Sequence, residues 1–127
     1  MIIALIVEDS LTDRTLLARY LEQIGFRVVN ANSSEEAIFA IQEELPDLVF
    51  IDIVLPGQSG FEFCRYLKTN KSTQHIPVVI CSSKSTEADK LWGSMLGANA
   101  YLSKPVNQQA IEQTVKQLAL GDTYATY

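Results

Sequence analysis

The chain has 127 residues, of which 47% are hydrophobic and 20% are charged, so it is long enough for one domain with a buried core and is not typical of a disordered protein. Its formal net charge is −5, and its lysines and arginines are scattered singly, which argues against a nucleic-acid-binding protein. The two cysteines, Cys64 and Cys81, lack metal-ligand spacing, and we expect buried, reduced thiols in a cytoplasmic protein.

The chain opens on a continuous apolar run at residues 2–7, which is typical of a buried parallel strand. This run ends at Glu8, well short of a signal-peptide core or a membrane span, so we expect neither. Ser10 can cap the helix that follows, and Gly25 supplies its left-handed end. The predicted buried face of this helix comprises Leu16, Leu17, Tyr20, Leu21 and Ile24.

A second, short strand is predicted at residues 26–30. Ser33 and Glu36 fit a capping box for the second helix, and Pro46 ends that helix. The apolar residues that recur at helical spacing between them are Ala37, Ile38, Ile41 and Leu45.

The central apolar run, residues 47–52, is bounded by Pro46 and by the turn residues 56–57, which favours a strand buried on both faces. Its last residue, Asp52, places a carboxylate where a core strand reaches the surface. Open parallel sheets bind their ligands at this carboxyl edge. A lone aspartate in this place would most simply mark the exit of the strand into solvent.

The third helix is predicted to begin at a capping box of Ser59 and Glu62, and a polar tract at residues 69–74 follows it as a loop. The apolar positions on one face of this helix are Phe61, Cys64 and Leu67. A fourth apolar strand is predicted at residues 76–81, and it ends at Ser82.

The fourth helix, which Gly97 ends, carries an apolar stripe that we expect to face the core. The stripe comprises Ala88, Leu91, Trp92, Met95 and Leu96. We interpret Met95 as a core residue. Trp92 lies nearer the flank of the stripe, so we expect it to be partly exposed and available as an aromatic anchor for a partner.

A short fifth strand is predicted at residues 100–103, and it leads directly to Lys104. Asn107 can cap the fifth helix, and Gly121 ends it. The buried face predicted for this helix comprises Ala110, Ile111, Thr114, Val115 and Leu118.

Five predicted strands therefore alternate with five predicted helices. Such alternation requires right-handed crossovers, and it predicts a parallel sheet with helices on both faces in a three-layer, doubly wound α/β fold. We expect residues 1–121 to form one domain and residues 122–127 to form a frayed carboxyl-terminal tail.

Polar residues follow four of the predicted strands: Glu8 and Asp9, Asp52, Ser82, and Lys104. Because the carboxyl ends of parallel strands lie at one edge of the sheet, we expect these side chains to meet. Three carboxylates repel one another unless a cation joins them, and oxygen ligands with open water positions suit Mg²⁺. An aspartate can accept a phosphoryl group as a nucleophile, and a lysine and a hydroxyl beside it supply the positioning and charge neutralisation that this transfer needs.

Each of these residues alone has a simpler interpretation. Glu8 and Asp9 would be a surface charge pair, Ser82 a helix-entry cap, and Lys104 a solvated lysine. Their conjunction at four strand ends favours a site for phosphoryl chemistry.

Together these motifs resemble the receiver domain of two-component response regulators, of the stand-alone type found in chemotaxis regulators. The resemblance covers residues 2–120. The motifs that carry it are Glu8-Asp9-Ser10, Asp52 with Leu55-Pro56-Gly57 and Gly60, Ser82, and Tyr101-Leu102-Ser103-Lys104-Pro105. It implies a flavodoxin-like sheet with the strand order 2-1-3-4-5.

The resemblance also implies that Asp52 is the phosphoacceptor. The implied ligands of Mg²⁺, or of Mn²⁺ in its place, are Glu8, Asp9, Asp52 and the backbone carbonyl of Val54. The residues implied to contact the phosphoryl group or to act as the switch are Ser82, Lys104 and the aromatic Tyr101.

The implied phosphoryl donor is a histidine kinase or a phosphotransfer protein. The chain would assist its own phosphorylation and dephosphorylation without being an enzyme in the usual sense. A downstream protein would bind the face formed by the fourth helix, the fifth strand and the fifth helix, and we expect neither a nucleic acid nor a membrane as a partner. Trp92-Gly93 and residues 96–101 also resemble the stand-alone regulators of pilus-motility chemosensory systems.

Three positions differ from the commonest pattern of that family. Ser82 replaces the more frequent threonine and keeps its hydroxyl. Val54 is apolar and cannot orient a water molecule, and Lys84 is basic. Because Val54 and Lys84 flank the phosphoryl site in the family, we expect them to tune the lifetime of the phosphorylated state.

Three other functions are compatible with parts of this pattern. A flavin-binding protein of the same architecture would need a phosphate loop after the first strand, where Glu8 and Asp9 would repel the flavin phosphate. A haloacid-dehalogenase-type phosphatase would need a second aspartate two residues after the first, where this chain has Leu11 after Asp9. The remaining alternative is a receiver-like module that docks partners without being phosphorylated.

Overall fold

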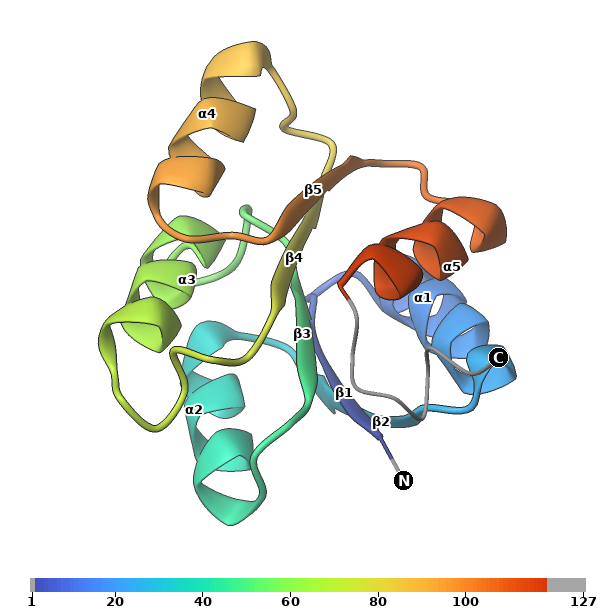
Figure 1. Cartoon of the computed structure of the whole chain (residues 1–127), viewed down its shortest axis with the longest axis horizontal. Helices are drawn as coiled ribbons and strands as arrows, with labels where there is room; N and C mark the ends of the chain where they lie inside the picture. The colour runs from blue at the N-terminus through green and yellow to red at the C-terminus, as the bar shows by residue number, and fades with distance from the viewer. Residues whose placement is uncertain (1, 119–127) are drawn as a thin grey trace.

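The computed structural model describes residues 2–118, in which strands and helices alternate strictly (Figure 1). The strands are β1 (Ile3–Val7), β2 (Arg27–Ala31), β3 (Leu48–Ile51), β4 (Val78–Ser82) and β5 (Ala100–Ser103). The helices are α1 (Leu11–Ile24), α2 (Ser34–Glu43), α3 (Gly60–Thr69), α4 (Glu87–Met95) and α5 (Gln108–Gln117). The predicted end of the fifth helix at Gly121 and the predicted tail at residues 122–127 lie outside the described residues.

The five strands form one parallel sheet in the order β2-β1-β3-β4-β5, which confirms the predicted flavodoxin-like fold. In the register of the sheet, Ala4 of β1 lies beside Val28 of β2 on one side and beside Leu48 of β3 on the other. Helices α1 and α5 cover one face, and α2, α3 and α4 lie on the other, so the fold has three layers (Figure 1).

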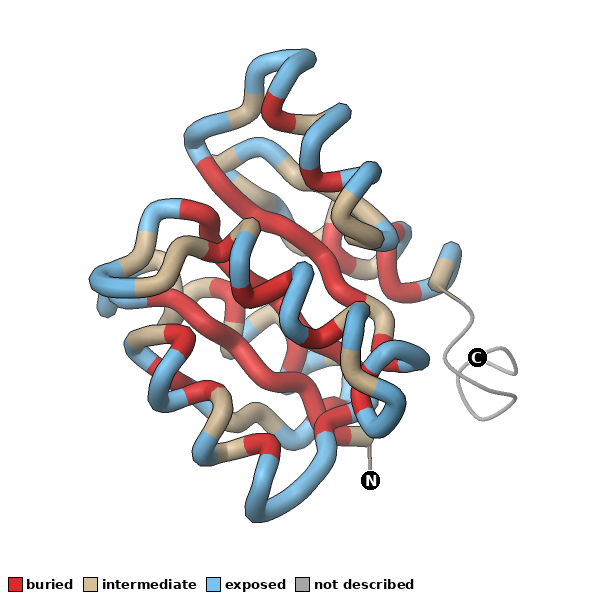
Figure 2. The backbone as a smooth tube through the Cα atoms, turned by 90° about the vertical axis from the view of Figure 1, so that its left-hand side faces the viewer, coloured by how far each residue is buried: buried red, intermediate tan, exposed pale blue. Residues whose placement is uncertain are grey.

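The core has two halves, one on each face of the sheet. Alternate residues of β1 point to opposite faces, so that Ala4 and Ile6 join α1 and α5 while Leu5 and Val7 join α2 and α3. This two-sided burial explains why β1, β3 and β4 are continuous apolar runs in the sequence, and Figure 2 shows them as buried stretches through the middle of the molecule.

Helix caps follow the sequence prediction closely. The four predicted caps accept a hydrogen bond from the backbone N–H three residues later, and they are Ser10, Ser33, Ser59 and Asn107. Gly25 ends α1 with φ of 112°, as its sequence position predicted. The capping box predicts that the Glu36 carboxylate accepts from the backbone N–H of Ser33. In the structure it accepts from the backbone N–H of Asn32 instead.

Two details of the predicted apolar faces are wrong. Leu45 was assigned to the buried face of the second helix, but α2 ends at Glu43 and Leu45 is exposed in the turn that precedes Pro46. In α3 the buried residues include Phe63, whereas Phe61, which was predicted for the buried face, is only half-buried. Phe63 could have been predicted, because Gly60, Phe63, Cys64 and Leu67 follow the i, i+3, i+4, i+7 spacing of a buried helical face.

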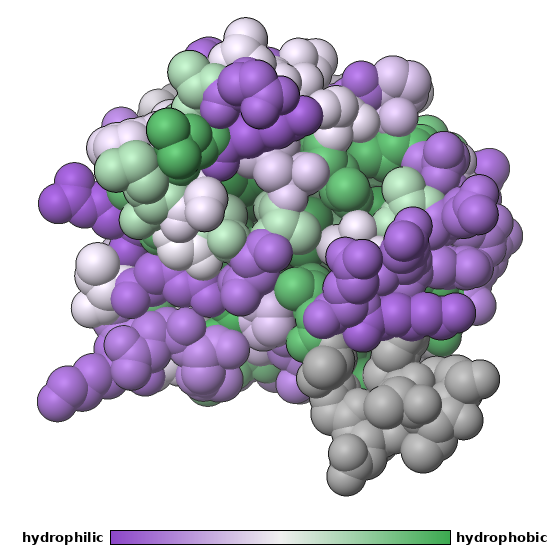
Figure 3. Space-filling view, turned by 45° about the horizontal axis from the view of Figure 1, so that its top comes forward, coloured by the Kyte–Doolittle hydropathy of each residue, from purple (hydrophilic) through white to green (hydrophobic). Residues whose placement is uncertain are grey.

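The largest correction concerns α4, where four of the five residues of the predicted core stripe are exposed and only Leu96 packs against the core. Leu91, Trp92 and Met95 are 63%, 48% and 67% exposed, and the buried residues of α4 are instead Asp89 and Gly93. The reason is the position of the helix: α4 packs mainly on β5, an edge strand that is itself only half-buried. The partial exposure expected for Trp92 is confirmed, and the core assignment of Met95 is wrong. Figure 3 shows hydrophobic atoms at the surface in its upper left part, where α4 lies.

The two cysteines are free and buried, as predicted. Within residues 2–118, the structure contains no helix with the length and apolar character that crossing a membrane requires.

Candidate functional site

The polar residues predicted at the strand ends meet at the carboxyl edge of the sheet. Glu8 follows β1, Asp52 follows β3, Ser82 ends β4 and Lys104 follows β5. Glu8, Asp52 and Lys104 line an open cleft of about 510 Å³, and Ser82 is buried beside it. Its lining residues are Glu8, Asp9, Ser10, Asp13, Asp52, Val54, Ser83, Lys104 and Pro105.

Lys104 is the centre of this cluster. Its Nζ lies 2.5 Å from Glu8 Oε1, 2.8 Å from Asp13 Oδ2 and 2.8 Å from Asp52 Oδ2. An ammonium group has three N–H donors, so each of them has a carboxylate partner. The predicted proximity of Glu8, Asp52 and Lys104 is therefore present in the structure.

Asp13 was not predicted as a site residue. It lies in the first turn of α1, where the helix dipole favours an acid. The signal that was available is topological: the first turn of α1 adjoins the carboxyl end of β1, so an acid there points toward the same edge of the sheet as Glu8 and Lys104.

The backbone fixes Asp52 in the cleft. Its N–H donates to the Val7 carbonyl at 3.1 Å, and its Oδ1 accepts from the Val54 N–H at 3.2 Å. Gly60, the first residue of α3, lies so close that a Cβ there would be 2.0 Å from the Asp52 carbonyl oxygen. Only glycine permits this approach, which explains why Gly60 stands at the start of α3.

The pKa values of the charged groups in the cleft shift in different directions. Burial raises the pKa of Asp52, but the hydrogen bonds from Lys104 and Ser82 outweigh burial and hold the pKa below its ordinary value. Burial dominates at Glu8 and raises its pKa, despite the bond from Lys104. Although burial lowers the pKa of Lys104, the bonds to Asp13, Asp52 and Glu8 raise it overall. Asp52 is therefore a carboxylate at neutral pH, which is the form that a nucleophile needs.

Asp9 and Val54 lie at the mouth of the cleft, and both are exposed. With Glu8 and Asp52 they offer carboxylate and carbonyl oxygens, a donor set that suits a hard divalent cation such as Mg²⁺. The ammonium of Lys104 lies between Glu8 and Asp52, and among residues 2–118 no three carboxylate, imidazole or thiol groups converge as metal ligands would. The types of donor atom in the cleft therefore suit a divalent cation. The Lys104 ammonium is the positive charge that would compete with that cation for Glu8 and Asp52.

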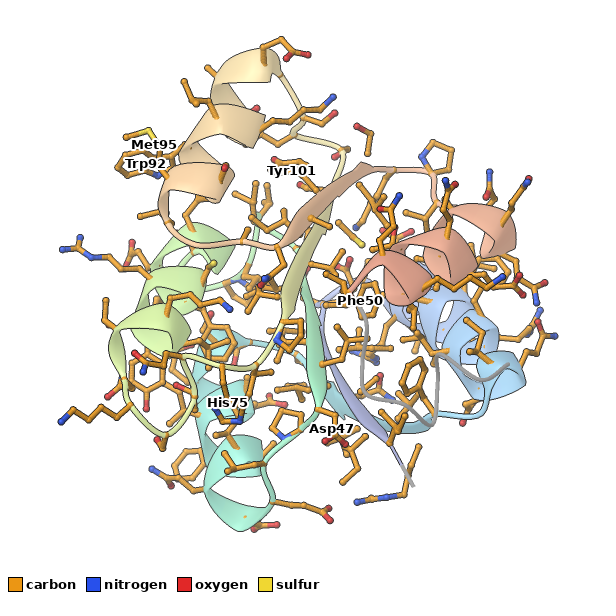
Figure 4. All side chains as sticks on the ribbon, viewed as in Figure 1. Asp47, Phe50, His75, Trp92, Met95 and Tyr101 are labelled. Atoms are coloured by element: carbon orange, nitrogen blue, oxygen red, sulfur yellow. The ribbon has the colours of Figure 1, made fainter. Side chains whose placement is uncertain are left out.

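Ser82 and Tyr101 are linked through the backbone of Lys84. The buried Ser82 Oγ accepts from the Lys84 N–H at 3.2 Å, and the Tyr101 hydroxyl donates to the Lys84 carbonyl. The Lys84 side chain extends toward α4, where Nζ lies 2.6 Å from Asp89 Oδ1. Figure 4 shows the Tyr101 ring between β5 and α4.

Asp89 is the second residue that sequence reasoning missed. The signal for it was local: Thr86 and Asp89 have capping-box spacing, and the structure contains both reciprocal bonds of that box. The fourth helix therefore begins at Glu87, capped by Thr86.

Comparisons with known proteins identify related chains. A family model described as "Response regulator receiver domain" matches residues 4–116. Protein PilH of Pseudomonas aeruginosa is 38% identical over 117 residues, which cover 92% of this chain and 97% of that protein.

Two solved structures are similar over nearly their whole length. The chemotaxis response regulator CheY4 of Vibrio cholerae has a TM-score of 0.86 and 25% sequence identity, covering 93% of this chain and 98% of that one. The Mn²⁺-bound form of response regulator Rcp1 has a TM-score of 0.78 and 26% identity, covering 94% and 92% of the two chains.

Proposed function

Because the chain belongs to the response regulator receiver domain family, we propose that Asp52 accepts a phosphoryl group from a phosphohistidine on a histidine kinase or phosphotransfer protein. One observation carries this proposal: a buried, ionised Asp52 lies at the base of an open cleft, with its Oδ2 2.8 Å from the Lys104 ammonium. Residues 1–121 would form the receiver domain, which is a phosphoacceptor and not an enzyme in the usual sense.

In the transfer, an Asp52 carboxylate oxygen forms a bond to phosphorus while the bond from phosphorus to the histidine nitrogen breaks. Lys104 neutralises charge on the transferred group, and the Ser82 hydroxyl donates to one of its oxygens. Glu8, Asp9, Asp52 and the Val54 carbonyl would hold Mg²⁺ or Mn²⁺, which supplies further charge neutralisation. The Mn²⁺-bound form of the related Rcp1 supports a divalent cation as the bound ion.

The lifetime of the phosphorylated state would depend on Val54 and Lys84. The Val54 side chain is 61% exposed at the cleft and offers no hydrogen bond to hold an attacking water in line. Lys84 acts through its backbone N–H, which binds the Ser82 hydroxyl. Val54→Asn is expected to speed loss of the phosphoryl group, and a decay as slow as that of the parent would contradict this role.

The signal would leave through the face formed by α4, β5 and α5, where a downstream protein binds. In this proposal Tyr101 turns inward when Ser82 is drawn toward the phosphoryl group, and the face changes shape. Exposed apolar residues on α4, among them Trp92 and Met95, offer an anchor for that partner (Figure 4). The similarity to PilH and to the chemotaxis regulator CheY4 supports a role in motility, and the free thiols fit a cytoplasmic protein.

The test is to mix the purified protein with Mg²⁺ and a small acyl-phosphate donor and to locate the phosphoryl group by mass spectrometry. The parent should carry one base-labile group, and Asp52→Asn should carry none. Asp47→Asn is the matched control, because Asp47 precedes the other end of the same strand and its carboxylate binds the Ile3 N–H. Labelling of Asp52→Asn at the level of the parent would refute the assignment, and an unlabelled parent would favour a docking module that works without phosphorylation.

The role of Lys104 has its own variant. Lys104→Ala should leave Mg²⁺ binding intact or strengthen it, because a competing cation is removed, and should uncouple phosphorylation from the conformational change. An unchanged response to phosphorylation in Lys104→Ala would contradict this part of the proposal.

A further inference from the structure

Asp13 is the third residue of α1, but its carboxylate does not complete the capping box of that helix. The hydroxyl of the cap Ser10 accepts from the Asp13 N–H at 3.3 Å. In a complete box the Asp13 carboxylate would accept in return from the Ser10 N–H. That N–H instead donates to Glu8 Oε2 at 3.1 Å. The Asp13 carboxylate binds the Lys104 ammonium, at 2.8 Å, in place of its own helix cap.

The three carboxylates that hold Lys104 differ in burial. The side chains of Glu8 and Asp52 are 6% and 9% exposed, whereas the side chain of Asp13 is 44% exposed. Glu8 and Asp52 are also the two that the proposed function assigns to the binding of Mg²⁺, and Asp13 is not among those ligands. When the two buried carboxylates bind a cation, Asp13 is therefore the carboxylate that remains for Lys104.

The residues beside Lys104 on the α1 side of the cleft include no third acid. A small pocket of about 50 Å³ lies there, and Glu8 and Asp13 are the acids that line it. The other residues that line it with Lys104 have apolar side chains or a thiol, and they are Leu16, Leu17, Cys81, Pro105 and Val106. An ammonium group that is released by Glu8 and Asp52 and lacks Asp13 would meet these side chains, which accept no strong hydrogen bond and make its burial costly.

We propose that Asp13 is a positioning residue, which keeps the Lys104 ammonium at the cleft when the carboxylates of Glu8 and Asp52 bind a divalent cation. This inference deepens the proposed function and rests on it. One N–H donor of Lys104 stays with Asp13, and the other two become available to the oxygens of a phosphoryl group. The cation and the ammonium then no longer compete for the same two carboxylates, so both positive charges stay beside Asp52 during the transfer.

Nuclear magnetic resonance of the Lys104 side chain tests the contact itself. Protons of an ammonium group exchange with water slowly only while acceptors hold them, so their exchange rate reports the partners of Lys104. In the parent, saturation with Mg²⁺ should leave this exchange slow. In Mg²⁺-saturated Asp13→Asn the exchange should be about tenfold faster than in the Mg²⁺-saturated parent, because the charged acceptor is gone. Equal rates in the two saturated proteins would overturn the proposal.

Calorimetric titration with Mg²⁺ measures the consequence for the cation. Asp13→Asn should weaken Mg²⁺ binding by about fivefold, because the displaced ammonium then has no carboxylate left. Glu62→Gln is the matched control, since Glu62 is the third residue of α3, follows the serine cap Ser59 in the same way and does not line the cleft. It should weaken binding by less than about twofold, because its charge is screened by solvent. Equal losses in the two variants would mean that net charge alone matters, and the positioning role would be wrong.

A cycle with Lys104→Met separates positioning of the ammonium from the nearby negative charge of Asp13. In the Lys104→Met background there is no ammonium to hold, so Asp13→Asn should weaken Mg²⁺ binding by about twofold at most. A loss as large as that in the parent background would make Asp13 only a nearby charge, and a larger loss would make it a direct ligand of the cation. Either result would contradict the proposal.

Failure of this inference is distinguishable from failure of the proposed function. A parent that binds Mg²⁺ but carries no phosphoryl group on Asp52 after treatment with a small acyl phosphate would refute the proposed function. The Mg²⁺ titrations and the exchange of the Lys104 ammonium would still decide on Asp13. A parent that binds no Mg²⁺ would refute the role of Asp13 directly, because that role requires the cation.

Discussion

Helices α1 and α4 carry similar apolar stripes, but α1 turns its stripe toward the core and α4 turns most of its stripe toward solvent. Helix α1 buries Leu17 and Leu21 against the sheet and α5, whereas α4 turns Leu91 and Met95 to solvent. The two helices differ in the strands on which they pack. Helix α1 packs on the fully buried strand β1 as well as on the edge strand β2, while α4 packs mainly on the half-buried edge strand β5.

This contrast separates residues that hold the fold from residues that are free to bind a partner. A fully buried leucine contributes about 1.5–3 kcal/mol relative to an exposed one, so the stripe of α1 stabilises the domain. The stripe of α4 gains nothing until another protein covers it. Exposed apolar side chains that are grouped on one element mark such contact surfaces.

The largest expected effect compares one leucine from each helix. Leu21→Ala should lower the free energy of unfolding by about 2–5 kcal/mol, because Leu21 is fully buried and its removal leaves a cavity. Leu91→Ala should change it by less than about 0.5 kcal/mol, because Leu91 is mostly in water already. Denaturant unfolding measures both. A loss at Leu91 as large as that at Leu21 would show that α4 buries its stripe after all.

The second effect concerns binding, and it rests on the proposed function. Trp92→Ser and Met95→Ser should each weaken a phosphorylation-dependent partner by about tenfold or more, as anchors of an interface do, with little change in stability. Phe39→Ser is the control, because Phe39 is 70% exposed on α2, away from the face formed by α4, β5 and α5. Titration of the partner measures the affinities. Equal losses at Phe39 and Trp92 would show that the α4 stripe is not the contact surface.

Sequence reasoning predicted the elements whose signals are local. Continuous apolar runs predicted the buried strands, and serine or asparagine at fixed spacing predicted the helix caps, because both patterns depend on neighbours within a few residues. The strand ends then predicted the meeting of Glu8, Asp52 and Lys104, since parallel topology brings carboxyl ends to one edge.

The sequence could not show which side of α4 faces the protein. Periodicity defines a stripe, and it does not say whether the sheet beneath has apolar surface left to cover. The contact of Asp13 with Lys104 was missed for another reason: Asp13 lies in the first turn of α1 and does not follow a strand directly, so the rule that strand ends meet did not include it. The pairing of Lys84 with Asp89 was missed although the two residues are close in sequence. The apolar stripe predicted that the opposite face of the helix is buried, and Asp89 was therefore expected to be exposed.

The third effect uses the two cysteines to compare the mobility of the two regions. Cys64 contacts the Leu96 carbonyl at the end of α4, at 3.9 Å from Sγ, whereas Cys81 lies in the core half covered by α1 and α5. Burial raises the pKa of both thiols, that of Cys64 to about 11, so each reacts only after local opening. Because α4 packs on an edge strand, Cys64 should be labelled by a thiol reagent about tenfold faster than Cys81.

Single-cysteine proteins make this comparison clean. Cys81→Ala leaves Cys64 as the reporter, and Cys64→Ala leaves Cys81. Equal labelling rates would mean that both sites open only with the whole domain, and that α4 is held as firmly as α1.

The smallest effect is a pH dependence at the start of α4. Hydrogen bonds, first from Lys84 and then from Thr86, lower the pKa of Asp89 to about 2. A carboxyl group with a lower pKa in the folded chain than in the unfolded chain adds stability above its unfolded pKa, and that stability is lost as the pH falls toward the folded pKa. The stability difference between the parent and Asp89→Asn should therefore be steady from neutral pH to about pH 5 and should shrink from there to about pH 2.

Denaturant unfolding at a series of pH values measures this difference, and acids shared by both proteins cancel in it. In a Lys84→Met background the same difference should be smaller, because the first of the bonds that lower the pKa is gone. A difference that stays constant down to pH 2 would show that Asp89 is not paired as an anion, and the contrast between α1 and α4 would then rest on burial alone.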